Sequence, residues 1–375
     1  MSTTVMLPNP ATPSNSPDSG EHKVAADLPA ANVDGTRRLL DRYGRVAQDL
    51  RVSLTDKCNL RCTYCMPAEG LEWMHNSAVL SDDEVVRLVR IAVEKLGIRK
   101  LRFTGGEPLL RKSLASIIER SKALRTDTGE APEIALTTNG LGLDKRVESL
   151  AAVGLDRINI SLDTIDREKY TALTRRDRLA HVLRSIDKCA QVGLDPIKIN
   201  ALVMKGVNED DVVDLAAYAL DKGAQLRFIE QMPLGPREAW SRQDMITADE
   251  ILQKLQAAFV MTPAKQPRGS APAALWDVWD DAERSVQRGK LGIISSVSYP
   301  FCGDCDRTRL TADGAIRTCL FSNSETQLRN HLRQGASDDE IAKIWAGAMW
   351  EKLPGHGIND EGFLQPARTM SAIGG

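Results

Sequence analysis

The sequence has little of several features that would place it quickly in a class. Its 375 residues hold only seven cysteines, too few for the disulfide framework of a small secreted domain. Its 49 Lys and Arg nearly balance 51 Asp and Glu, so no global charge draws it to nucleic acid or to an anionic membrane. No apolar run approaches the roughly 18 residues of a transmembrane helix. These absences favour a soluble protein whose anion sites are local.

The first 45 residues also lack aromatic side chains, apart from Tyr43, and they lack the basic and apolar regions of a secretory signal. They carry several prolines among Ser, Ala, Asn and Asp. Such a segment buries too little apolar surface to offset its ordering entropy. We therefore predict a disordered leader over residues 1–45 and, since no targeting signal is visible, a cytoplasmic protein.

Short apolar or β-branched runs alternate with segments of helical periodicity from residue 46 onward. Six strands are predicted, over 50–54, 100–104, 133–138, 157–162, 196–203 and 225–231. This alternation indicates parallel strands with right-handed crossovers, and it fits either an open doubly wound sheet or a barrel. After about residue 245 the alternation fades. We predict a β/α domain over 46–245 and a smaller C-terminal domain over 246–375.

Six of the seven cysteines fall into two triplets. The first, directly after the first strand, is Cys58, Cys62 and Cys65, and the second is Cys302, Cys305 and Cys319. A structural zinc ion wants four ligands, whereas three thiolates can hold an iron-sulfur cubane with one iron open. A zinc site completed by His331 remains an alternative for the second triplet. The remaining thiol, Cys189, is interpreted as a buried structural residue.

Arginines stand immediately after the second triplet, in the run Arg307-Thr308-Arg309. The guanidinium fork suits bidentate contact with phosphate oxygens. This juxtaposition indicates a nucleotide bound beside the second triplet. Asp304 and Asp306, which flank Cys305, receive no role.

The run CNLRCTYC from Cys58 to Cys65, together with Gly105-Gly106-Glu107-Pro108 after the second strand, resembles the radical S-adenosylmethionine (SAM) superfamily. The resemblance implies a [4Fe-4S] cluster whose open iron chelates SAM, and cleavage of SAM to a 5′-deoxyadenosyl radical. The implied SAM contacts are Tyr64, Gly106, Ser161 and Met232.

Within that superfamily, residues 48 to 375 resemble the GTP 3′,8-cyclase family, through runs such as LRFTGGEPLLR, IKINALVMKGVNEDD and FCGDCDRTRLTADG. The resemblance implies an incomplete (β/α)6 barrel closed by the C-terminal domain, a second [4Fe-4S] cluster, and conversion of GTP to 3′,8-cyclo-7,8-dihydro-GTP at the first step of molybdenum cofactor biosynthesis. The implied GTP contacts are Arg51, Arg102, Thr137, Lys198, Arg307, Thr308 and Arg309. It also implies that the terminal Gly374 and Gly375 enter the active site.

The implied partners are GTP, an electron donor of unknown identity, and the cyclic pyranopterin monophosphate synthase that receives the product. No nucleic-acid or membrane partner is expected, and a homodimer stays open. Two rival functions remain: another radical SAM enzyme with an auxiliary cluster, such as a peptide-modifying maturase, and a zinc-binding scaffold or nucleic-acid-binding protein. Individual residues also have plainer interpretations, since Arg51, Arg102 and Lys198 could form ion pairs inside the sheet. Met232 could simply pack in the core.

Overall fold

The computed structural model describes residues 38–236 and 240–374. The leader prediction lies outside the described residues up to residue 37, but it is wrong for the residues that follow. Strand β1 (Leu39–Leu40) pairs antiparallel with β2 (Val46–Ala47), and the side chain of Leu39 is fully buried. The contact of β1 with helix α9 explains the order, because it buries apolar side chains that the segment alone leaves exposed.

A single 12-stranded sheet forms the centre of the described chain, in the order β14-β13-β12-β3-β4-β5-β6-β7-β8-β11-β10-β9. Its parallel part consists of β12 (Arg307–Leu310), β3 (Asp49–Ser53), β4 (Lys100–Thr104), β5 (Glu133–Thr138), β6 (Arg157–Ser161), β7 (Ile197–Val203), β8 (Gln225–Glu230) and β11 (Gln287–Ile294). The six strands predicted from the sequence agree with β3 to β8 within one residue at each end.

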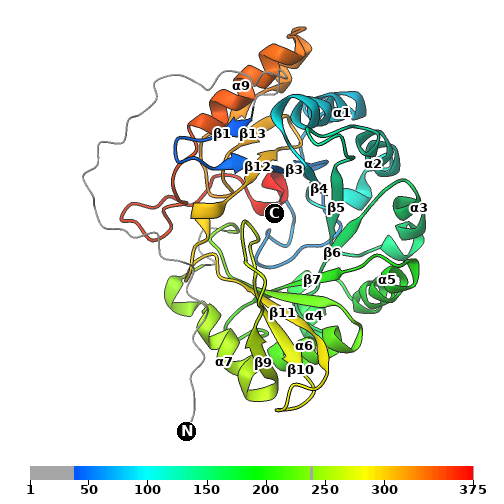
Figure 1. Cartoon of the computed structure of the whole chain (residues 1–375), viewed down its shortest axis with the longest axis vertical. Helices are drawn as coiled ribbons and strands as arrows, with labels where there is room; N and C mark the ends of the chain where they lie inside the picture. Colours follow the sequence, from blue (N-terminus) through cyan, green and yellow to red (C-terminus); the bar gives the residue numbers. More distant parts are fainter. Residues whose placement is uncertain (1–37, 237–239, 375) are drawn as a thin grey trace.

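The C-terminal part of the chain extends this sheet at both edges. Strand β12 pairs parallel with β3, and β11 pairs parallel with β8. Antiparallel strands complete the edges: β9 (Val260–Pro263), β10 (Ala274–Trp279), β13 (Ala315–Arg317) and β14 (Thr326–Gln327). Figure 1 shows the strands curving around a centre in which the C-terminal end of the chain lies.

Helices cover the outer face of the sheet. They are α1 (Asp82–Arg90), α2 (Leu114–Lys122), α3 (Val147–Ala152), α4 (Arg167–Thr174), α5 (Leu179–Val192), α6 (Val212–Asp221), α7 (Ala248–Ala258), α8 (Arg329–Arg333) and α9 (Asp338–Trp350). The short helix α10 (Met370–Ile373) lies instead inside the curve of the strands (Figure 1). None of those within 38–236 and 240–374 has both the length and the apolar character needed to cross a membrane.

Local signals place most helix starts. Ser81 caps α1 and Glu84 returns the bond, as the capping-box pattern predicts. The sequence also suggests a helix start at Asn208, ahead of Asp210 and Asp211, but α6 begins at Val212. The Asn208 amide instead donates to the carbonyls of Asp163 and Leu202. The side chain satisfies a buried loop, and this tertiary demand overrides the capping preference.

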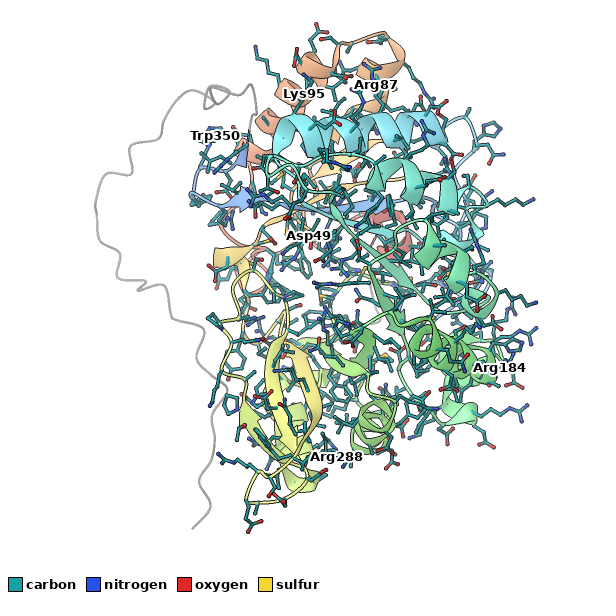
Figure 2. The ribbon with its side chains drawn as sticks, turned by 45° about the vertical axis from the view of Figure 1, so that its right-hand side comes forward. Asp49, Arg87, Lys95, Arg184, Arg288 and Trp350 are labelled. Carbon is teal, nitrogen blue, oxygen red and sulfur yellow. The ribbon has the colours of Figure 1, made fainter. Side chains whose placement is uncertain are left out.

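Ion pairs join the C-terminal helix α9 to the first helix. Arg87 donates to Asp338 at 2.9 Å, and Lys95, in the π-helical turn that extends α1, pairs with Asp339. Both cations are labelled in Figure 2. The chain therefore folds back so that α9 lies against the start of the β/α region.

Candidate active site

The inner face of the sheet carries a row of cations. In the strand register, Arg309 on β12 lies opposite Arg51 on β3, which lies opposite Arg102 on β4. Neighbouring inner-face positions hold Thr137, Asn159, Lys198, Asn200 and Arg227. Because side chains alternate along a strand, the residues between them point outward and are apolar, as Leu101 and Ile160 are.

The cations of this row repel one another in a buried setting. Burial lowers the pKa of Arg51 well below its usual value, with further lowering from Arg309 and Arg102. Burial lowers the pKa of Lys198 to about 7, and Arg227 and Arg157 add to the effect. Such a row favours an anionic ligand, since negative charge would relieve both the burial and the repulsion.

Ion pairing inside the sheet does not account for the row. Arg102 approaches Asp49 only to 3.9 Å, and within the described residues no ion pair involves Arg51 or Lys198. The Nε atoms of Arg51 and Arg102 and the Oδ1 of Asn200 are buried without a hydrogen-bond partner. A buried donor left unpaired costs about 1–3 kcal/mol. The two guanidinium donors fit a ligand with several acceptor oxygens, whereas the Asn200 oxygen fits a donor such as a hydroxyl group.

The glycines after β4 hold the first cysteine loop. A side chain on Gly106 would lie 2.3 Å from the carbonyl oxygen of Lys57, so only glycine fits. The Gly106 amide donates to Thr55 at 2.7 Å, and the Glu107 amide donates to Lys57 at 2.8 Å. The carboxylate of Glu107 is buried and accepts from Thr138 and from the amide of Asn139, while burial raises its pKa to about 7.

Burial favours the protonated form of the thiols in the first triplet. Burial raises the pKa of Cys58, raises that of Cys65 to about 12, and together with Asp163 raises that of Cys62. Tyr64 donates to Asp163 at 2.8 Å. Metal binding at this loop would release these protons.

Within the described ranges no three Cys, His, Asp or Glu side chains gather as a single-ion site. In a cubane each thiolate binds a different iron, so the three sulfurs stand farther apart than around one zinc. The zinc alternative with His331 finds no support here, because His331 is exposed and joins no such group.

The sequence suggests that residues 175–178 form a solvated loop, but the side chain of Arg175 is partly buried. Arg175 adopts a left-handed backbone with φ 55°, and its guanidinium donates to the carbonyls of Arg61 and Met66 at 2.8 and 3.0 Å. Arg175 therefore braces the first cysteine loop from the far end of α4.

Cations surround the second cysteine loop. Lys352 is only 3% exposed, and its ammonium donates to the carbonyls of Cys305 and Arg307 and lies 3.4 Å from the Cys305 sulfur. Arg307 also lies 3.4 Å from that sulfur. Although burial acts in the opposite direction, Lys352 and Arg307 hold the pKa of Cys305 below its usual value.

The segment that precedes β3 supports this second loop from below. Arg45 is paired with Asp41 at 2.5 Å, and its guanidinium donates to the carbonyls of Cys302 and Pro354 at 2.7 Å. One buried guanidinium thus links the N-terminal strands, the second cysteine loop and the segment after α9.

The C-terminal tail reaches both the first cysteine loop and the cation row. Arg309 donates to the Gly374 carbonyl at 2.5 Å, and the backbone of Ser371 hydrogen-bonds to the Cys65 sulfur. Gly374 has φ 77°, and a side chain there would lie 2.1 Å from the Ser53 hydroxyl. Gly375 lies outside the described residues.

Of three predicted SAM and GTP contacts on the strands, two lie on the inner face of the sheet and one does not. Ser161 and Thr137 lie on the inner face, in line with Asn200 and Asn159. Thr308 does not belong with them: its hydroxyl accepts from Trp345 on the opposite face, because strand residues alternate.

Two further predicted residues lie near the second triplet. Met232 packs in a small apolar cluster with Cys319 and Met370, as its plainer interpretation expects. Arg307 turns toward Cys305 and the Phe301 ring.

Three inner-face residues escaped the sequence analysis: Asn159, Asn200 and Arg227. The signal was available in runs such as Ile-Lys-Ile-Asn, where polar and apolar residues alternate with period two. Strands of a sheet covered on both faces are usually apolar throughout, so this alternation marks a polar interior.

Taken together, a three-cysteine loop after the first parallel strand and a Gly-Gly-Glu turn that holds it define the radical SAM class of α/β proteins. The family model of the Radical SAM superfamily matches residues 52–219, and that of Molybdenum Cofactor Synthesis C matches residues 224–358. The chain is 64% identical over 379 residues to GTP 3′,8-cyclase of Corynebacterium glutamicum, with 100% of both chains covered. It is 54% identical over 351 residues to GTP 3′,8-cyclase of Mycolicibacterium smegmatis, covering 94% of this chain and 95% of that one. The chain belongs to the GTP 3′,8-cyclase family of radical SAM enzymes.

Solved structures agree at the level of the fold. Streptococcus suis SuiB superposes with a TM-score of 0.57 at 12% identity, covering 84% of this chain and 68% of that one. Its complex with the precursor peptide SuiA gives a TM-score of 0.56 at 13% identity, covering 80% and 64%. At such identity the likeness concerns the fold alone. The peptide-modifying alternative therefore gains nothing from it, whereas the full-length relatives favour the cyclase.

Proposed function

We propose that this chain converts GTP to (8S)-3′,8-cyclo-7,8-dihydroguanosine 5′-triphosphate, the first step of molybdenum cofactor biosynthesis. The observation that carries the proposal is the buried cation row of Arg309, Arg51 and Arg102 in register across three strands, beside both cysteine loops. A triphosphate carries the charge that this row needs, and family membership supplies the reaction.

Two [4Fe-4S] clusters and SAM would complete the site. Cys58, Cys62 and Cys65 would hold the first cluster, and Cys302, Cys305 and Cys319 the second. Bound at the first cluster, SAM supplies one-electron chemistry that generates a carbon-centred radical. Tyr64, Gly106, Ser161 and Met232 are the proposed SAM contacts. Gly106 would also keep the first cysteine loop close to the end of β4, since its missing side chain leaves room for the Lys57 carbonyl.

The chain's own task is to bind and orient GTP. Arg51, Arg102, Lys198 and Arg309, joined by Arg227, would neutralise the triphosphate, and Thr137 lies on the same face. Burial of these groups strengthens each charge contact and excludes water from the reacting nucleotide. Arg307 would sit between the nucleotide and the second triplet, which Lys352 also supports. We leave Thr308 out of this set.

The finer architecture belongs to the same proposal. Strands β3 to β8 would form an incomplete (β/α)6 barrel, and residues 246–375 would close its open side while lending β11 and β12 to its edges. None of the seven cysteines forms a disulfide, in keeping with a reducing compartment such as the cytoplasm. The proposed partners are an electron donor and the downstream synthase that receives the product.

Anaerobic reconstitution tests the function directly. The chain with iron, sulfide, SAM and a chemical reductant should hold about eight irons, as two cubanes require, and should convert GTP to the 3′,8-cyclic product detected by mass spectrometry. Zinc in place of iron, with a featureless visible spectrum, would overturn the proposal. Cleavage of SAM without conversion of GTP to the cyclic product would overturn it as well.

A further inference from the structure

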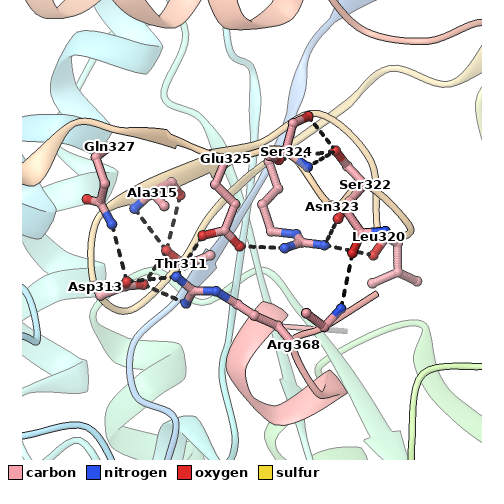
Figure 3. A network of polar contacts seen from close by, with 12 residues as sticks. Thr311, Asp313, Ala315, Leu320, Ser322, Asn323, Ser324, Glu325, Gln327 and Arg368 are labelled. Carbon is pink, nitrogen blue, oxygen red and sulfur yellow. Dashed lines mark hydrogen bonds and ion pairs between the residues drawn. The ribbon is translucent and has the colours of Figure 1, made fainter. Parts of the chain in front are cut away.

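One arginine in the tail makes unusually many ionic contacts for a residue so near the end of a chain. Arg368 donates through both terminal nitrogens to Asp313, at 2.9 Å each, and also to Glu325 at 2.7 Å. Figure 3 shows Arg368 reaching from the tail into the loops that carry these two carboxylates. A guanidinium held by two carboxylates in this way has lost most of its freedom.

Both carboxylates are themselves held in place. Asp313, in the turn between β12 and β13, accepts from the hydroxyl of Thr311 at 2.6 Å. Glu325, just before β14, pairs with Arg317, whose side chain is 2% exposed. Figure 3 shows these contacts as one network. Because it is partly buried and shares its charges, this network should be worth more than an isolated surface pair.

The network belongs to the hairpin that carries other site residues. Arg309 stands on β12, and Cys319 follows β13. An anchor on this hairpin therefore fixes the tail relative to the cation row and to the second triplet. Between the anchor and the chain end, Met370 packs against the same apolar cluster as Cys319, and the side chain of Ile373 is buried.

The second contact that holds the tail is the hydrogen bond from Arg309 to the Gly374 carbonyl, and a bound substrate would affect it. Arg309 belongs to the cation row, so a bound triphosphate would compete with the Gly374 carbonyl for its guanidinium. A tail seated by Arg309 alone would loosen when the nucleotide arrives. Arg368 lies away from the row and keeps its partners whether or not an anion is bound.

We propose that Arg368 is a positioning residue, a latch whose clamp on Asp313 and Glu325 keeps the C-terminal tail seated in the site while GTP occupies the cation row. The proposal rests on the function proposed above only for the tail's part in the reaction. The latch itself is a property of the chain and can be tested without clusters, by digestion with GTP absent and with GTP at a saturating concentration.

Carboxypeptidase digestion tests the latch. Its matched control is Arg333→Gln, because Arg333 also grips a carboxylate through two nitrogens, that of Glu84, but far from the tail. We expect Arg368→Gln to release its terminal glycines about tenfold faster than wild type, read by mass spectrometry, as the loss of a strong charge pair predicts. Arg333→Gln should be digested at the wild-type rate. Equal rates for Arg368→Gln and wild type would overturn the latch.

A conservative variant keeps the test decisive if Arg368→Gln does not fold. Arg368→Lys retains the charge but not the fork, so it should give an intermediate digestion rate. Asp313→Asn, which removes the bidentate partner, should match Arg368→Gln. Failure of all three variants to fold would assign the network to the fold rather than to the tail, and would overturn the proposal.

Activity then separates the latch from the proposed function. In reconstituted Arg368→Gln, cyclisation should fall while SAM cleavage persists, and a peptide with the sequence of residues 364–375 should restore part of it in trans. Rapid tail release with full cyclisation would support the latch and overturn the tail's role in the reaction. Lost cyclisation with wild-type tail release would overturn the latch.

Discussion

The two cysteine loops present the same number of thiols in opposite electrostatic settings. The first has carboxylates as neighbours: Asp163 helps to raise the pKa of Cys62, and Glu107 adds to the rise at Cys58. The second has cations, and Lys352 and Arg307 lower the pKa of Cys305. In the proposed function these settings match their ligands, because SAM carries a sulfonium and an ammonium group whereas the nucleotide is a polyanion.

The loops also differ in where their supports come from. The first is held by Gly106 and Glu107, one strand further along the chain. The second is held by Lys352, at a similar separation in the sequence, and by Arg45, which lies 257 residues before Cys302. The first loop and its glycines can be recognised as motifs in the sequence, whereas no motif marks Arg45 as a support of the second loop.

Removing cysteines should separate the loops most strongly. Alanine at Cys58, Cys62 or Cys65 should abolish SAM cleavage, since the open iron is lost, and alanine at Cys302, Cys305 or Cys319 should spare cleavage but stop cyclisation. The readouts are 5′-deoxyadenosine and cyclic product by chromatography. Cys189→Ala is the control, because Cys189 is buried in α5 outside both triplets. Equal loss of both activities in a folded second-triplet variant would make that loop merely structural.

Gly374→Ala should nearly abolish cyclisation, because the new methyl group would lie 2.1 Å from the Ser53 hydroxyl. Deleting Gly374 and Gly375 should have the same result with both clusters intact, and a peptide ending in Gly-Gly should rescue it in part. Gly129→Ala is the control, since Gly129 has a similar backbone with φ 82° but nothing lies within 4 Å of the added carbon there. Full activity after the deletion would show that these two glycines have no role in the reaction.

Arg309→Lys and Arg307→Lys test the cation row at its edge. Each keeps the charge and loses the planar fork, so GTP affinity should fall, by less than the roughly 2–5 kcal/mol that truncating a desolvated charge partner costs. Isothermal titration with GTP measures the change. Wild-type affinity in both variants would place these arginines outside the triphosphate site.

Lys352→Met sharpens the electrostatic difference between the loops. Without its ammonium beside the Cys305 sulfur, the second triplet should retain less iron on reconstitution, while the first retains its own. Iron per chain, measured in a Cys58→Ala background, isolates the second loop. Lys343→Met, on the exposed side of α9, should leave the iron content unchanged. Unchanged iron in Lys352→Met would remove this lysine from the support of the second loop.

The smallest expected effect concerns pH. Lys198 has a pKa lowered to about 7 by burial and by Arg227, Arg157 and Arg102, so it is largely neutral above pH 7 in the free chain. A bound triphosphate would raise that pKa, so binding takes up a proton and GTP affinity should fall as pH rises from 7 to 9. Lys198→Met should flatten this part of the pH profile. An identical slope in both proteins would exclude Lys198 from the site.

The strands and the helix caps can be predicted from the sequence because they depend on neighbours along the chain. The six strands and the capping box at Ser81 follow from residues within a few positions of each other, and the glycines after β4 are recognisable as a motif although the loop they contact lies about 45 residues earlier. The alternation of Lys198 and Asn200 with isoleucines also indicates a polar inner face.

Contacts between residues far apart in the sequence depend on the tertiary structure. It ordered the segment around Leu39 against α9, turned Thr308 away from the inner face, and brought Arg45 and Arg368 to carboxylates and carbonyls far along the sequence. A charged residue could pair with many groups of suitable chemistry. The packing of the sheet and helices that carry it determines which of them it contacts. Local patterns state which groups are available, and the folded chain alone sets the distances between them.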